Sequence, residues 1–156
     1  MRCGRWFVSI LLLGGGLLGL LGAVMMAIQA FQRHQGLRIV SAVLGGVLFG
    51  WSIIAGIALW QATRRGFKWA KILFALQIPI FSLGHCVYEF STFLGLRVEI
   101  GNTTRHLGAD IGSSSNIYWL PQPAGFLLGV NVVAVLVLLY LVWASNRPSQ
   151  PTKSTA

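Results

Sequence analysis

Residues 72–96 have the sequence ILFALQIPIFSLGHCVYEFSTFLGL, an apolar run without Lys, Arg or Asp. Glu89 is the one acidic residue in this run, and His85 precedes it by four positions. An ionisable side chain at the centre of a transmembrane helix costs roughly 2.5 to 3.5 kcal/mol on insertion scales, so it is rarely present without a functional reason. Glu89 is therefore the leading candidate for a functional residue.

The composition of the whole chain is typical of an integral membrane protein. Of its 156 residues, 55% are hydrophobic and 10% are charged, and the mean hydropathy is +0.72; soluble domains carry about 25% charged residues. Continuous apolar runs of this length favour membrane-spanning helices over the alternating strands of a barrel. The sequence predicts an all-α fold, a four-helix transmembrane bundle in one domain over residues 1–145, with helices at about 6–31, 39–62, 70–96 and 123–145.

The connection between the third and fourth predicted helices, residues 97–122, is long and polar. Apolar and polar residues alternate on both sides of the Gly101–Thr104 turn signal, which is typical of a β-hairpin. We expect a small extracytoplasmic hairpin here, followed by a loop over Gly112–Asn116. The last residues, 146–156, contain Pro, Ser and Thr and predict a disordered cytoplasmic tail.

Basic residues predict the orientation of the bundle. Eight of them flank the ends of the runs that lie on one side: Arg2, Arg5, Arg64, Arg65, Lys68, Lys71, Arg147 and Lys153. Four lie on the other side: Arg33, Arg38, Arg97 and Arg105. This bias predicts cytoplasmic N- and C-termini, and four tryptophans fall at the same inner boundary: Trp6, Trp60, Trp69 and Trp143. The compact chain and its lack of eukaryotic sorting signals favour a multi-pass protein of a bacterial inner membrane.

A cleaved signal peptide is the alternative for the first run. The stretch from Trp6 to Ala30 is longer than the 7–15 apolar residues of a signal sequence, and Ile28 stands where a cleavage site needs a small residue. We therefore expect a retained helix.

The net charge of +9 raises the question of nucleic-acid binding. The cations lie at the ends of apolar runs rather than along one folded face, so no nucleic-acid partner is expected. The inner loop Arg64-Arg65-Gly66-Phe67-Lys68-Trp69-Ala70-Lys71 admits two interpretations. It either contacts anionic lipid head groups or serves only as a determinant of topology, with snorkelling side chains.

The first two predicted helices carry pairs of glycines four residues apart, Gly15 with Gly19 and Gly46 with Gly50. Such pairs let helix backbones approach closely in lipid. They predict either contact with a second copy of the chain or another membrane protein, or packing within the bundle itself.

A small polar cluster is expected in the outer half of the bundle. On a helix, Ser82, His85 and Glu89 would share one face, and Asn131 would lie at a similar depth on the fourth helix. In one interpretation they form a proton or ligand site, in which Glu89 takes the proton. In the other they form a hydrogen-bonded clasp between helices, which reaches Arg97 or Arg105 in the overlying loop.

Cofactor and enzyme chemistry have little support in the sequence. Only one of the three histidines lies within a predicted helix, so paired haem ligation is not available, and no spacing of His, Cys or acidic residues is typical of a zinc site. Cys3 and Cys86 are predicted too far apart for a disulfide. We therefore expect a non-enzymatic structural or interaction protein without cofactor or metal, or, as the alternative, a small proton-coupled carrier built on Glu89 and His85.

Overall fold

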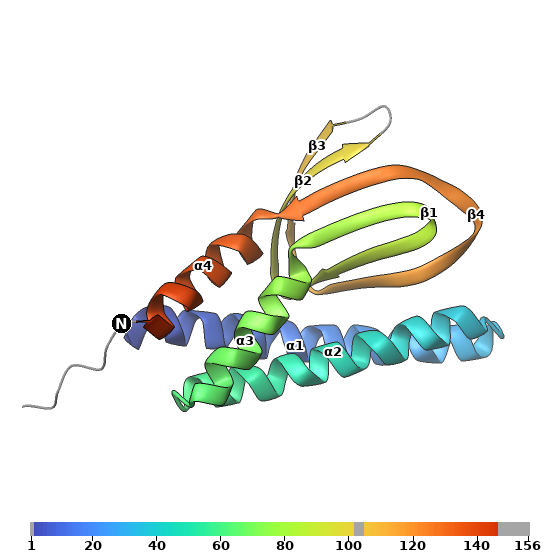
Figure 1. The fold of residues 1–156 in the computed structure, drawn as a ribbon. Coiled ribbons are helices and arrows are strands. Elements are labelled where there is room, and N and C mark those ends of the chain that lie inside the picture. The colour runs from blue at the N-terminus through green and yellow to red at the C-terminus, as the bar shows by residue number, and fades with distance from the viewer. Residues whose placement is uncertain (1, 102–104, 147–156) are drawn as a thin grey trace, which may run out of the picture.

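The computed structural model describes residues 2–101 and 105–146, and in these residues four helices are combined with a four-stranded antiparallel sheet (Figure 1). The prediction of an all-α, four-helix transmembrane bundle is therefore wrong. In chain order the elements are α1 (Arg2–Gln32), α2 (Gly36–Trp60), α3 (Arg64–Gln77), β1 (Pro79–Ser91), β2 (Leu94–Gly101), β3 (Arg105–Ile111), β4 (Ser114–Asn131) and α4 (Val132–Asn146).

The first two predicted helices are present and form an antiparallel hairpin. Among the described helices, α1 and α2 are the two that are long and apolar enough to cross a membrane. They pack closely, because Gly19 admits the ring of Phe49, which any larger residue at this position would overlap. The buried Ser52 hydroxyl donates to the Leu12 carbonyl at 3.0 Å and adds a polar contact to this interface.

The third apolar run changes from helix to strand at Pro79. Ile78 still has helical backbone angles, with φ −68° and ψ −54°, and its amide donates to the Ala75 carbonyl as the C-cap. Pro79 has no backbone N–H to donate, so the helical hydrogen bonds cannot continue and α3 ends at Gln77. Gly84 then has a φ of 58° and lies at an irregularity in the pairing of β1 with β4. The expected helix over 70–96 is therefore a 14-residue helix followed by a long strand.

The fourth apolar run is also divided. Its first half belongs to β4, and helix begins only at Val132, so α4 has 15 residues rather than the expected span over 123–145. Gly129 explains why β4 can take the central position here. A Cβ at this residue would lie 2.8 Å from Cγ of Glu99 and 3.2 Å from the carbonyl oxygen of Val98 on the neighbouring strand.

The strands are ordered β1-β4-β2-β3, and every neighbouring pair is antiparallel. β1 and β4 form a long, strongly bent ribbon, which Figure 1 shows curving away from the rest of the sheet. The predicted hairpin is present as β2 and β3, paired from Leu94 with Ile111 to Ile100 with Arg105. Residues 102–104 of its turn and residues 147–156 of the predicted tail lie outside the described residues, and the expected loop over 112–116 is partly strand β4.

The core lies where the α1–α2 hairpin meets α3, α4 and the sheet. Its largest fully buried apolar side chains come from five elements: Leu12, Phe49, Leu59, Leu73, Phe90 and Leu141. The polar residues Gln77 and Asn131 are also fully buried. The chain enters α3 through Thr63, whose hydroxyl accepts from the Gly66 amide at 3.0 Å and donates to the Ala58 carbonyl at 2.9 Å. This cap holds α3 tightly against the end of α2.

Candidate functional site

Glu89 lies in β1 at the centre of a network of hydrogen bonds. Its Oε1 accepts from Nη1 of Arg97 at 2.5 Å and from the Ser114 hydroxyl at 3.0 Å, and its Oε2 accepts from the Asn116 amide at 2.9 Å. We call these four residues the Glu89 cluster. Asn116 stands opposite Glu89 in the register of β1 and β4, so strand pairing itself delivers this donor.

The Glu89 cluster is mostly shielded from solvent. The side chain of Glu89 is 14% exposed and that of Arg97 is 24% exposed. Glu99 also lies near the Arg97 guanidinium, at 3.8 Å. Charge-assisted hydrogen bonds of this kind are shorter and stronger than neutral ones. The carboxylate is therefore fixed by one cation and two neutral donors.

A cavity of ≈ 230 Å³ adjoins the cluster. Its described lining consists of Glu89, Ser91, Arg97, Ile111, Gly112, Ser113 and Ser114. It is large enough for several water molecules, which need roughly 30 Å³ each. The carboxylate thus has both protein partners and space for water beside it.

His85 and Ser82 do not lie beside Glu89 as they would on a helix. Both lie on β1, and along a strand a residue four positions away is about 13 Å distant rather than one helical turn away. His85 is exposed, and Ser82 is half-buried opposite Leu127 of β4. The prediction of one shared helical face is therefore wrong, because these residues are not helical.

Asn131 lies close to the cluster but has a different role. It stands opposite Arg97 in the register of β2 and β4, and it is 1% exposed. Its Oδ1 accepts from the Ala134 amide at 3.3 Å. A side-chain oxygen that binds the amide three residues ahead is the geometry of a helix N-cap, so Asn131 begins α4.

Replacing Asn131 by Ala is expected to lower the free energy of unfolding by about 1 to 2 kcal/mol, because the α4 N-terminus loses its cap. Asn131→Ser keeps an acceptor oxygen and is expected to recover part of this loss. Unfolding of the purified chain in detergent, followed by circular dichroism, measures both changes. Equal losses for the Ala and Ser variants would show that the cap does not explain the role of Asn131.

Glu89 contacts Arg97, one of the two arginines named for the predicted clasp, but the contact joins strands β1 and β2 rather than two helices. The partners Ser114 and Asn116 were not predicted. These two residues belong to the sequence Ser-Ser-Ser-Asn at 113–116, which lies within the expected loop. Four consecutive hydrogen-bonding side chains are the signal that could have drawn attention to them. Ser113, the residue before β4, is also engaged: its hydroxyl donates to the Gly15 carbonyl of α1 at 2.6 Å.

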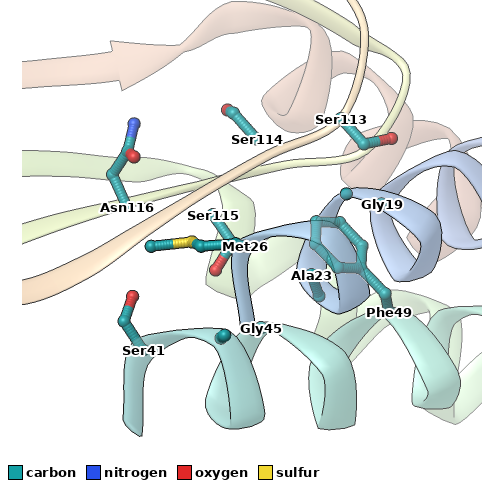
Figure 2. A pocket seen from close by; sticks show the side chains of 12 residues that line it. Gly19, Ala23, Met26, Ser41, Gly45, Phe49, Ser113, Ser114, Ser115 and Asn116 are labelled. Carbon is teal, nitrogen blue, oxygen red and sulfur yellow. The ribbon is translucent and has the colours of Figure 1, made fainter. Parts of the chain in front are cut away.

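A second cavity, of ≈ 220 Å³, lies between the helical hairpin and the start of β4 (Figure 2). We call it the interface cavity. Its described lining comes from three elements: Gly19, Gly22, Ala23 and Met26 of α1; Ser41, Ala42, Gly45 and Phe49 of α2; and Ser113, Ser114, Ser115 and Asn116. Sequence patterns do not predict this cavity, since it arises from contacts between segments that are distant in the chain.

The four cations of the predicted inner loop lie on α3 instead. Arg64, Arg65 and Lys68 are exposed, while Lys71 is half-buried and donates to the Ser145 hydroxyl of α4 at 3.4 Å. Near this end of the hairpin the rings of Trp6 and Trp60 are in contact, with centroids 4.1 Å apart and planes tilted by 34°. The start of α1, the end of α2 and the start of α3 therefore lie together at one end of the molecule (Figure 1).

Other reactive groups are dispersed. Burial raises the pKa of Tyr88 above its ordinary value of 10.0, and its hydroxyl donates to the Leu76 carbonyl at 2.7 Å. Cys3 is exposed and Cys86 is half-buried, and both are free thiols. Within residues 2–101 and 105–146, no three His, Cys, Asp or Glu side chains gather as metal ligands would.

We found no relative of this chain among known proteins. No protein-family model, no curated protein and no solved structure matches the chain.

Proposed function

We propose that this chain is an integral membrane protein anchored by α1 and α2, with a structural or interaction role and no catalytic activity. The observation that carries the proposal is a one-sided, exposed apolar surface on α1. Its members are adjacent in sequence or three or seven residues apart, spacings that keep them on one side of a helix. They are Trp6, Phe7, Ile10, Leu17, Leu18, Leu21, Val24, Met25, Ile28 and Phe31.

α2 continues the same kind of surface. Its exposed apolar residues are Leu37, Val40, Val43, Leu44, Val47, Ile54, Ile57 and Trp60. Soluble monomers rarely expose contiguous apolar patches beyond a few hundred Å². A surface along two helices of 31 and 25 residues is better suited to lipid than to water. We call this surface the hairpin apolar face.

The distribution of charge supports an orientation. Cations and tryptophans gather at the end of the hairpin that holds the N-terminus and α3, and such residues mark the cytoplasmic interface of a membrane. We therefore place this end at the cytoplasmic side of a bacterial inner membrane. There Arg64, Arg65, Lys68 and Lys71 would contact anionic lipid head groups.

The glycine pairs support different partners for the two helices. Both glycines of α1 pack against residues of the same chain: Gly15 against Thr92 and Phe93, and Gly19 against Phe49. At Gly50 of α2, an added Cβ would meet no described atom within 4 Å. At Gly46 an added Cβ would lie 3.9 Å from Cβ of Ala23, so this glycine faces α1. A second copy or another membrane protein that binds α2 through a small residue would therefore contact Gly50.

Membrane fractionation tests the proposal. The full chain is expected to stay in the membrane pellet after alkaline carbonate extraction. Leu21→Arg changes a residue that is 64% exposed on the hairpin apolar face, and it is expected to reduce the retained fraction, because Arg costs roughly 2.5 to 3.5 kcal/mol in a membrane helix. His34→Arg is the matched control, since His34 is exposed in the turn between α1 and α2. Recovery of the wild-type chain in the soluble fraction would refute the membrane anchor.

The cavity beside Glu89 favours one second candidate, a proton-coupled carrier. A carrier would need Glu89 to exchange its proton through this space. Proteoliposomes with an internal pH-sensitive dye distinguish the two functions. A proton flux in the wild type that Glu89→Gln abolishes, while leaving the fold intact, would favour the carrier; no flux in the wild type agrees with the structural role.

A further inference from the structure

We infer that the interface cavity is a binding site for an uncharged, hydroxyl-bearing ligand, a glycerol head group with or without an acyl chain. The inference goes beyond the membrane anchor, which would hold whether the cavity is occupied or not. It begins with two hydroxyls. Ser41 on α2 is 1% exposed, and neither its Oγ nor the buried Oγ of Ser115 has a hydrogen-bond partner among the described residues.

These two hydroxyls lie on opposite sides of the cavity. In Figure 2 the Ser41 hydroxyl points from α2 toward β4, and the Ser115 hydroxyl points from β4 toward α2. Ser115 also sits directly over Gly45, where an added Cβ would lie 2.8 Å from its Oγ. Leaving a buried hydroxyl unpaired costs about 1 to 3 kcal/mol, and buried polar groups in folded proteins nearly always have a partner.

The other polar groups at the cavity are already committed. Ser113 donates to the Gly15 carbonyl, and Ser114 and Asn116 donate to Glu89. These bonds fix the chain on both sides of Ser115, so its side chain is held over α2. The cavity therefore presents two preorganised hydroxyls, each able to donate one hydrogen bond and to accept others.

The remaining lining determines the class of ligand. The twelve described residues around the cavity are all uncharged, so neither an anion nor a cation would find a counter-charge there. Phe49, Met26 and Ala23 supply apolar contact. A volume of ≈ 220 Å³ corresponds to roughly seven water-sized groups. A molecule with adjacent hydroxyls and a short apolar part fits these properties.

Two sources could provide such a group, free glycerol or the glycerol head of a monoacylglycerol in the membrane. The test uses the full chain in phosphatidylcholine nanodiscs, titrated with glycerol or with 1-monocaprylin. Thermal unfolding detects binding, because a ligand that binds only the folded state raises the unfolding temperature. We expect a saturable shift. A shift with the ester alone identifies the lipid source, and a shift with both shows that the polyol itself suffices.

Two variants and one control connect any shift to the cavity. Gly22→Leu adds a side chain at the rim, where an added Cβ would meet no described atom within 4 Å, and it is expected to abolish the shift. Gly50→Leu makes the same change on α2, outside the lining, and is expected to keep the shift. Ser41→Ala is expected to weaken binding about five- to tenfold, through one lost hydrogen bond.

The stability of Ser41→Ala without ligand distinguishes ligand binding from ordinary packing. Without ligand, Ser41→Ala is expected to be at least as stable as the wild type, because it removes an unpaired hydroxyl. The inference is overturned if neither probe shifts the wild type, which would leave water as the only occupant. It is equally overturned if Gly22→Leu binds as well as Gly50→Leu does.

Discussion

Gly66→Ala is expected to lower the free energy of unfolding by about 3 kcal/mol, although alanine is the better helix former. Gly66 lies in the first turn of α3, and an added Cβ would overlap the carbonyl group of Ala58 and the amide nitrogen of Leu59 in α2. These are backbone atoms of a buried helix end, which cannot turn aside as a flexible side chain can. Overpacking of this kind typically costs 1 to 3 kcal/mol, and the rigid obstacle favours the upper end.

Gly50→Ala is the matched control for this prediction. Gly50 is also helical, but an added Cβ there would meet no described atom within 4 Å, so helix propensity alone should act and stabilise the chain by about 0.5 to 1 kcal/mol. Unfolding in detergent, followed by circular dichroism, measures both variants. Changes of the same sign would show that α3 does not pack on α2 as closely as described.

Glu89→Gln is expected to lower the free energy of unfolding by about 2 to 3 kcal/mol. The change leaves the Arg97 guanidinium largely shielded and without its closest counter-charge. Breaking a fully buried ion pair from one side costs about 3 to 5 kcal/mol, and the partial exposure of Arg97 reduces this figure. Glu99→Gln is the control, because Glu99 lies 3.8 Å from the same guanidinium and is similarly shielded. It is expected to cost less than about 1 kcal/mol.

A double-mutant cycle then isolates the pair. Combining Glu89→Gln with Arg97→Met should cost clearly less than the sum of the two single changes, because the second change removes the charge that has lost its closest partner. Additive losses, or equal losses for Glu89→Gln and Glu99→Gln, would show that the Glu89–Arg97 contact contributes no specific stability.

The sequence predicted those parts of the fold that local patterns determine. The hairpin of α1 and α2 follows from two long apolar runs with basic ends, and β2 and β3 follow from strict alternation around Gly101. The predictions of full-length helices for the third and fourth apolar runs were wrong, because an apolar segment can form a buried strand as readily as a helix. Composition alone does not distinguish the two structures. A proline within an apolar run is compatible with a kinked helix or with the start of a strand, and Pro79 is the first residue of β1.

The candidate site could be predicted only in part, for the same reason. Glu89 is rare enough in its surroundings to be noticed, and Arg97 is close in the sequence. Ser114 and Asn116 reach Glu89 only because β4 pairs with β1 across more than twenty residues. Once Glu89 is placed on a strand, His85 is no longer its neighbour by helical spacing, and this weakens the carrier interpretation that joined the two residues.

The strand order also has a consequence for synthesis. β4 lies between β1 and β2 in the sheet, yet it is the last of the four strands to leave the ribosome. Between completion of β1 at Ser91 and of β4 at Asn131 the chain grows by 40 residues, which takes roughly 2 to 8 s at about 5 to 20 residues per second. During that interval α1 and α2 are already complete, while β1 has no partner strand. The newborn protein therefore holds an unpaired apolar strand beside a finished hairpin, and the sheet closes only when its central strand arrives.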